Sequence, residues 1–189
     1  MQKADTRNRN YAAVVYPDSA PENWREILKN QHVPAFISPL HDRDINADGS
    51  PKKPHWHIVL KFAGKKSLNQ VTEITNALNA PAPQVCKDIR AYARYLCHLD
   101  NPEKAQYDVG EVECLGGADY LETISTAADI DILVSEIEAW IDEQGCYSYA
   151  GLCRYARQYR PDWARLLRTR CTLHITAYIK SCLWEHRTN

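Results

Sequence analysis

The chain has 189 residues, 44% of them hydrophobic, so it can bury the core of one ordinary domain and a smaller appendage. Its net charge of −1 excludes nucleic-acid binding through an overall positive charge, and any such contact must rest on local basic patches. The N-terminus lacks the apolar stretch of a signal peptide, and no apolar run approaches the roughly 20 residues that span a bilayer. We therefore expect a cytoplasmic protein that does not associate with membranes.

The first two thirds of the chain alternate strand and helix patterns. Runs of β-branched and aromatic residues bounded by turn residues predict strands at 10–17, 33–40, 55–62, 81–89 and 107–114. Apolar residues at helical spacing predict helices at 20–31, 67–79 and 90–99. Ser67 is placed to cap the second of these helices. The pattern predicts an α+β fold in which helices pack on a mostly antiparallel sheet.

From Tyr120 onward the sequence predicts only helices. They cover residues 127–145, 149–159 and 161–184, and the first of them is acidic. The pair Gly116-Gly117 marks the boundary, which divides the chain into a domain over 1–117 and a helical segment over 118–189. The end of this segment is locally basic, which fits either a solvated helix face or a surface that contacts DNA or further copies of the chain.

Two histidines lie two residues apart in the stretch PKKPHWHIVLKF, residues 51–62. In an alternating strand His55 and His57 share one face, whereas Trp56 and Ile58 lie on the other, which we expect to be the buried one. The two histidine Cα atoms would lie about 6 to 7 Å apart, close enough for both imidazoles to bind one ion.

A histidine and an aspartate follow the preceding strand in the stretch SPLHDRD. At the end of that strand, the side chains of His41 and Asp44 can reach across to the neighbouring strand. Together with His55 and His57 they would supply three imidazoles and one carboxylate, a set suited to a divalent cation such as Mn²⁺, with Zn²⁺, Co²⁺ and Mg²⁺ as alternatives.

Residues 44–55 also resemble a calcium-binding loop. They match its pattern except at the last position, where His55 replaces the glutamate that supplies two oxygen ligands. Strand patterns and prolines flank the segment where a calcium loop needs helices. The better interpretation is a turn that joins two strands, in which Gly49 adopts a positive φ.

The predicted helix over 90–99 contains two tyrosines. Helical spacing places Tyr92 and Tyr95 on one face, with His98 or Leu99 one turn further on. Taken alone, a tyrosine in a helix is usually a core or boundary residue.

Three ordered motifs, SPLHDRD, KKPHWHIVLKF and RYLCHLDNPEKAQY, give the chain its family resemblance. In this order and spacing they resemble the rolling-circle replication initiators of small bacterial plasmids, the pMV158-like group of the HUH endonucleases. The resemblance is strong from Tyr11 to Tyr107 and looser in the helical tail.

The resemblance implies a central antiparallel sheet of about five strands flanked by helices. It also implies that the ligands of a catalytic divalent metal are His41, Asp44, His55 and His57. Tyr95 would be the nucleophile, and Tyr92 is the one competing candidate for that role. At His98 related viral initiators carry a lysine, so this residue would contact the phosphate or tune the tyrosine, unless it is an ordinary surface histidine.

The implied reaction is metal-dependent nicking and rejoining of single-stranded origin DNA through a 5′-phosphotyrosyl intermediate. The cation would neutralise charge on the phosphodiester, and Tyr95, with an ordinary pKa near 10, would need a base or the field of the cation. The product would keep the energy of the broken bond, so the same enzyme could rejoin strands.

Local positive charge is predicted to hold the DNA. The residues concerned surround the histidine strand and are Lys52, Lys53, Lys61, Lys65 and Lys66, with additions from Lys3, Arg7 and Arg9. Two other functions remain open. A non-catalytic DNA-binding regulator would need neither the ligands nor Tyr95, and a hydrolase that activates water would leave no covalent adduct.

Overall fold

The computed structural model describes residues 5–188, and Lys3 lies outside this range. The chain falls into two compact units, Met1–Ile124 and Ser125–Asn189. Among the described residues, no helix is both long enough and apolar enough to cross a membrane.

The first unit is built on a five-stranded antiparallel sheet with the strand order β4-β1-β3-β2-β5. The strands are β1 (Asn8–Val15), β2 (Ala35–Ile37), β3 (Trp56–Lys66), β4 (Gln84–Val85) and β5 (Glu113–Leu115). The longest strand, β3, lies at the centre, between β1 and β2. The predicted α+β class and its sheet of about five strands are confirmed.

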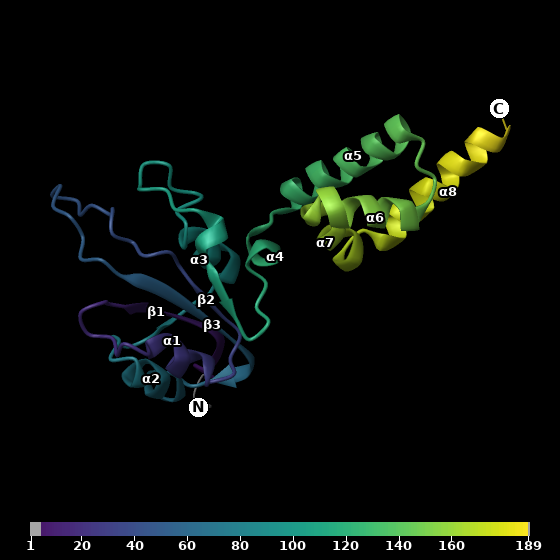
Figure 1. The fold of residues 1–189 in the computed structure, drawn as a ribbon. Coiled ribbons are helices and arrows are strands. Elements are labelled where there is room, and N and C mark those ends of the chain that lie inside the picture. The colour runs from purple at the N-terminus through teal and green to yellow at the C-terminus, as the bar shows by residue number, and fades with distance from the viewer. Residues whose placement is uncertain (1–4, 189) are drawn as a thin grey trace. The chain divides into compact units, whose positions relative to one another are not determined.

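Helices cover both faces of this sheet (Figure 1). On one face lie α1 (Trp24–Lys29) and α2 (Leu68–Ala77). The other face carries α3 (Ile89–Tyr95) and α4 (Tyr120–Ile124), and a single 3-10 turn (Val109–Glu111) precedes β5. The predicted cap of α2 is confirmed, because the Ser67 hydroxyl accepts a hydrogen bond from the Gln70 amide.

Alternation along β3 sends side chains into two separate cores. Ile58 and Leu60 are fully buried against α1 and α2, whereas Val59 is fully buried on the opposite face with Phe36 and Leu96. The expectation that only the Trp56 face is buried is therefore wrong. Because α3 and α4 cover the second face, the histidine side of the strand is buried as well.

The segment between β2 and β3 is a β-hairpin turn, as predicted. The Asn46 amide donates to the Ser50 carbonyl at 2.8 Å, and Gly49 has a φ of +84°. The hairpin and the loop that follows α3 both project from the sheet (Figure 1). Asp44 is 5% exposed at the base of this hairpin. No helix pair frames the segment, so the calcium-loop alternative does not fit.

The glycine pair after β5 brings the chain close to the start of β2. Gly116 and Gly117 have φ values of +59° and +74°. A Cβ atom on Gly116 would lie 2.9 Å from the Pro34 backbone nitrogen, so both conformation and space require glycine there. The chain then continues into α4, whose Tyr120 and Ile124 pack in the core that contains Phe36. The first compact unit therefore extends beyond the predicted boundary at residue 117.

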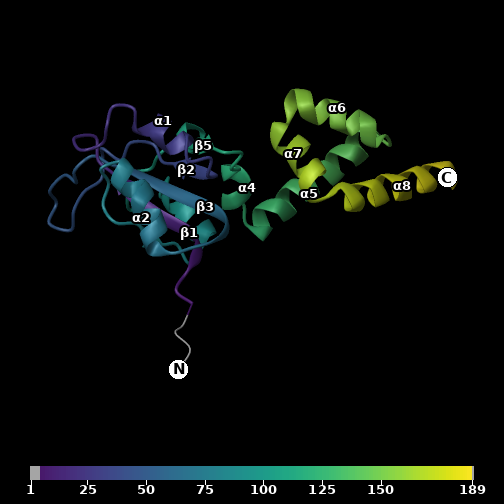
Figure 2. The same cartoon turned by 90° about the horizontal axis from the view of Figure 1, so that it is seen from below.

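Over its described residues, 125–188, the second unit has helices and no strand (Figure 2). They are α5 (Ala127–Gln144), α6 (Tyr149–Tyr159), α7 (Pro161–Thr169) and α8 (Thr172–Thr188). The single helix predicted over 161–184 is wrong, because the chain breaks at Arg170–Cys171, where the Cys171 amide donates back to the Leu166 carbonyl. This turn lets Leu167 of α7 and Ile175 of α8 enter the same core.

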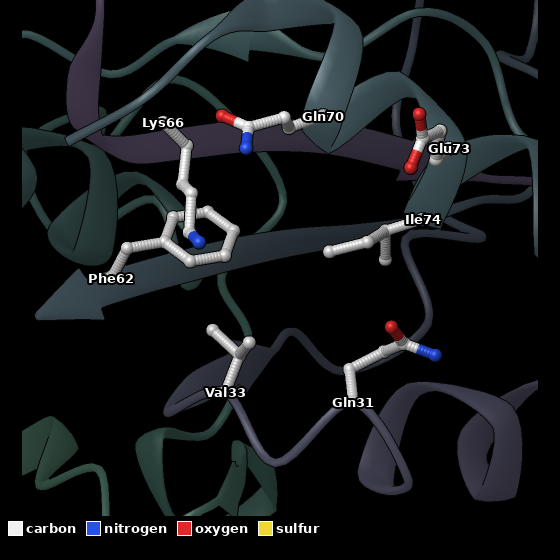
Figure 3. A pocket seen from close by; sticks show the side chains of 7 residues that line it. All are labelled: Gln31, Val33, Phe62, Lys66, Gln70, Glu73 and Ile74. Carbon is white, nitrogen blue, oxygen red and sulfur yellow. The ribbon is translucent and has the colours of Figure 1, made fainter. Parts of the chain in front are cut away.

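A hollow of about 350 Å³ lies on the α1 and α2 side of the sheet (Figure 3). Phe62, Val33 and Ile74 form its apolar walls, and Lys66, Gln70 and Glu73 lie at its polar edge. Phe62 and Ile74 belong to the core opposite to the histidine face of β3. This hollow is therefore separate from the site formed by the histidines.

Removing α4 is expected to destabilise the first unit. A chain ending at residue 117 loses the buried Tyr120 and Ile124 side chains, and with Tyr120 a hydrogen bond of 2.9 Å to the Ala93 carbonyl. We expect its free energy of unfolding to be lower by about 4 kcal/mol or more than that of a chain ending at residue 124. Denaturant titration followed by circular dichroism measures the difference. Equal stability of the two chains would show that α4 does not belong to the first unit.

Candidate active site

Three of the predicted site residues meet where the segment after β2 pairs with the segment before β3. The His41 amide donates to the His55 carbonyl at 2.8 Å, and the His55 amide donates to the His41 carbonyl at 3.2 Å. His57 follows on the same face of β3. The His41 ring centroid lies 5.3 Å from that of His55 and 5.0 Å from that of His57. The structure thus brings the three imidazoles together.

Backbone carbonyls determine which nitrogen of two of these rings carries the proton, because a carbonyl can only accept. His41 Nε2 lies 2.9 Å from the Leu96 carbonyl, and His55 Nδ1 lies 2.8 Å from the Lys53 carbonyl. In the neutral rings this leaves lone pairs on His41 Nδ1 and His55 Nε2. His55 Nε2 lies 3.2 Å from His57 Nε2, so both nitrogens can face the same ion.

Asp44 lies close to two histidines, His41 and His98, rather than to His55 and His57. Its Oδ2 lies 3.5 Å from His41 Nδ1 and 3.8 Å from His98 Nε2. Its Oδ1 accepts a hydrogen bond of 3.1 Å from the Tyr107 hydroxyl, and the Tyr107 ring stacks on His41 at 4.3 Å. Among the described residues, two groups of side chains could hold a metal ion, namely His41, His55 and His57, and His41, Asp44 and His98.

His98 is a fully buried residue, which excludes the surface-histidine interpretation. Its Nδ1 lies 2.7 Å from the Ala105 carbonyl, so in the neutral ring the lone pair is on Nε2, towards Asp44. The predicted helix over 90–99 ends earlier, at Tyr95, and His98 has a φ of +57°. This turn directs His98 into the protein rather than along the face of α3.

The chemistry of this cluster fits a bound cation. His41 Nδ1, His98 Nε2 and Asp44 Oδ2 all point towards one another. Among the described residues, neither His41 Nδ1 nor His98 Nε2 has a hydrogen-bond partner. Buried acceptors without a donor are costly, and a positive ion between them would offset that cost.

Burial keeps the His41 and His57 rings neutral at neutral pH. It lowers the pKa of His57 to about 3, with further lowering from the neighbouring His41 and His55, and it also lowers the pKa of His41. At neutral pH both rings therefore keep a lone pair for a cation. Burial raises the pKa of Tyr92 to about 12, so its hydroxyl, which lies 3.4 Å from His57 Nδ1, stays protonated.

Helix α3 places the predicted nucleophile next to the histidines. Tyr95 is the last residue of the helix, and its ring centroid lies 5.4 Å from that of His57 and 5.0 Å from that of His98. The Asp88 carboxylate caps the start of α3 by accepting from the Ala91 amide at 2.9 Å. The half-buried Tyr95 ring thus forms one edge of the site.

A basic side chain that the sequence analysis missed lies against Tyr95. The ammonium group of Lys104 lies 4.5 Å from the centre of the Tyr95 ring. Lys104 and the predicted Lys52 both line a small hollow of about 100 Å³ that also borders Asp44. The motif DNPEKAQY contains this lysine, but only the loop after α3 brings it back to the tyrosine. Tyr107 was missed as a partner of Asp44 for the same reason.

The other predicted basic residues do not form one patch. Lys53 pairs with Asp18 at 2.6 Å. Lys61 lies four residues along β3 from His57, and its ammonium group is 3.4 Å from the Thr123 hydroxyl. Lys65, near the far end of β3, pairs with Asp5. With about 3.3 Å per residue, Lys65 lies roughly 25 Å from His57 along the strand. Arg7 also pairs with Asp5, and Arg9 is exposed.

Comparison with known proteins assigns both units to one family. Residues 3–121 match the family described as plasmid replication protein, origin binding domain, and residues 127–183 match replication protein RepB, C-terminal. The chain is 41% identical to the replication protein RepB of Lactiplantibacillus plantarum, over 93% of this chain and 81% of that protein. It is 39% identical to a replication protein of Staphylococcus aureus, over 95% of this chain and 91% of that protein.

A more distant relative is the replication protein RepB of Streptococcus agalactiae, which is 25% identical over 61% of this chain and 60% of that protein. The motifs already indicated the pMV158-like group, and the matches cover the sheet unit and the helical unit alike. The chain therefore belongs to the RepB-type plasmid replication proteins, the pMV158-like rolling-circle initiators, and carries their origin-binding domain.

Proposed function

We propose that this replication protein nicks and rejoins single-stranded plasmid origin DNA through a covalent bond between Tyr95 and a 5′ phosphate. One observation carries the proposal: the Tyr95 ring packs against His57 and His98, beside buried acceptor atoms that favour a cation. A nucleophile and a cation site next to each other are what attack on a phosphodiester requires.

The proposed ligands are His41, His55 and His57, with Asp44 beside His41. Neutral imidazoles combined with a carboxylate favour Mn²⁺, and Mg²⁺, Co²⁺ and Zn²⁺ are the alternatives to compare. A bound divalent ion would withdraw charge from the phosphate and so make attack on phosphorus easier. The carbonyl contacts of His41 and His55 would hold their rings in the required orientation.

Tyr95 would be the nucleophile of this reaction. Its hydroxyl oxygen attacks phosphorus and its proton passes to a base, while the bond to the 3′ oxygen breaks and that oxygen takes up a proton. The products are a 5′-phosphotyrosyl bond and a free 3′-hydroxyl. Because the new bond keeps the energy of the old one, a 3′-hydroxyl can attack it and restore the phosphodiester. The Lys104 ammonium would stabilise negative charge that develops beside the Tyr95 ring.

DNA would be held by charge near the site and further away. Lys52 and Lys104 border the site, and Lys53, Lys61, Lys65 and Lys66 would contact more distant phosphates. The helical unit would assemble copies of the protein or anchor it on DNA. In these roles the protein would act in the bacterial cytoplasm, where it would meet plasmid DNA.

The Tyr95→Phe protein is expected to form no covalent adduct. A pool of random-sequence single-stranded oligonucleotides is incubated with protein and Mn²⁺, and adducts that resist denaturant are isolated and sequenced. We expect the unmodified protein to yield adducts that share a cleavage sequence. Tyr92→Phe is the matched control and should retain the adduct, since the Tyr92 hydroxyl contacts His57 and burial raises its pKa to about 12.

The same experiment separates the other functions. Cleavage without an adduct would indicate a hydrolase that activates water, and binding without cleavage would indicate a regulator. An adduct that persists in Tyr95→Phe but disappears in Tyr92→Phe would assign the nucleophile to Tyr92.

Adjacent residues of β3 should respond differently to substitution. His57→Ala removes a proposed ligand and is expected to weaken Mn²⁺ binding by more than about 100-fold, as measured by calorimetry. Trp56→Phe should leave that affinity unchanged and lower the free energy of unfolding by about 1 to 2 kcal/mol, because Trp56 packs on Trp24 on the opposite face. Normal Mn²⁺ affinity in His57→Ala would contradict the proposed ligand set.

Tyr107→Phe tests the neighbour of Asp44. The change keeps the ring that stacks on His41 but removes the hydroxyl that donates to Asp44. We expect Mn²⁺ affinity to fall about tenfold, because the carboxylate loses the contact that orients it. Tyr120→Phe, which removes a buried hydroxyl bonded to the Ala93 carbonyl, is the control and should bind Mn²⁺ normally. Equal affinities in the two variants would exclude a role for the Tyr107 hydroxyl.

A further inference from the structure

Another cavity, of about 390 Å³, opens beside the site on the histidine face of the sheet. His57, Tyr92 and Tyr95 line one part of it, so the proposed nucleophile belongs to its wall. Whatever occupies this cavity would lie directly against the reacting group.

The register of the sheet explains why there is space here. Val14 pairs with His57 and Ala12 pairs with Gln84, so these side chains lie on one face of the sheet. Alanine and valine are short, and Ala82, which precedes β4, also lines the cavity. Small side chains from β1 and from the segment before β4 therefore leave a hollow next to α3.

The lining favours a flat, uncharged and partly polar ligand. Three tyrosines, Tyr16, Tyr92 and Tyr95, offer ring surfaces, and the exposed Gln84 offers an amide that can donate and accept hydrogen bonds. Among the described lining residues none is a lysine or arginine. The nearby ammonium groups of Lys53 and Lys104 lie 4.8 Å from the Tyr16 ring centre and 4.5 Å from the Tyr95 ring centre. Arg43, Lys52 and Lys104 border the other hollow, on the Asp44 side of the site.

We propose that this cavity binds one unpaired nucleobase of the DNA strand, next to the phosphate that Tyr95 attacks, and that Gln84 reads the edge of that base. This inference rests on the proposed nicking function. Bases stack on aromatic side chains whatever their sequence, and a glutamine amide can distinguish them by paired hydrogen bonds. A base bound in the cavity would hold the attacked phosphate beside Tyr95. That phosphate would then face the histidines and Lys104.

Two variants test the cavity in opposite ways. Ala82→Trp fills it from an exposed position, and Gln84→Ala removes the amide. The matched control is Val85→Ala, because Val85 is the neighbouring residue of the same strand, pairs with Tyr11 and lies on the other face. Thermal unfolding verifies that all three proteins fold.

The first measurement is the base preference around the cleavage point in adducts selected from the random pool. We expect Gln84→Ala to lose the preference at one position that flanks the nick, and Val85→Ala to keep the full consensus. An unchanged consensus in Gln84→Ala would overturn the assignment of that residue.

The second measurement does not depend on cleavage. The affinity for labelled single-stranded oligonucleotides of 12 nucleotides is measured by fluorescence anisotropy in the presence of EDTA. We expect Ala82→Trp to bind about tenfold more weakly than the unmodified protein, since one base loses its stacking surface. Equal affinities would overturn the base pocket. If the unmodified protein forms no adduct at all, the proposed nicking function fails, and this binding measurement alone decides the pocket.

Discussion

The site depends on hydrogen bonds from histidine rings to backbone carbonyls. Leu96, Lys53 and Ala105 each accept from one ring, which leaves the lone pairs of His41, His55 and His98 pointing inward. Because a carbonyl cannot donate, these contacts determine which nitrogen carries the proton when a ring is neutral. The buried site therefore contains several acceptors, and this electrostatic imbalance favours a cation.

Those carbonyls come from three different segments, so the orientation of the histidine rings depends on how these segments pack together. Lys53 lies just before β3, Leu96 is the residue that follows the end of α3, and Ala105 lies in the loop after α3. Movement of α3 relative to the sheet would alter both the His41 orientation and the Tyr95 position. The core under α3, with fully buried Val59 and Leu96, opposes such movement.

Two hollows with different lining residues lie beside the site. Lys52 and Lys104 border the hollow on the Asp44 side, while alanines, tyrosines and a glutamine line the cavity beside β1. A nucleotide is divided in the same way, into an anionic phosphate and a flat neutral base. The arrangement is consistent with one nucleotide spanning Tyr95, and it explains why a protein with a net charge of −1 can still contact DNA locally.

The sequence by itself determined the class of fold, the alternation of strands and helices in the first unit, the face shared by His55 and His57 and the family, because these depend on local periodicity and on ordered motifs. Only the tertiary structure decided which distant groups meet. It buried the histidine face under α3, turned His98 inward through a positive φ, and brought Lys104 and Tyr107 back to the site. It also broke the last predicted helix at Arg170–Cys171, since both parts bury apolar residues in one core. Contacts across long separations follow from packing, which periodicity along the chain does not encode.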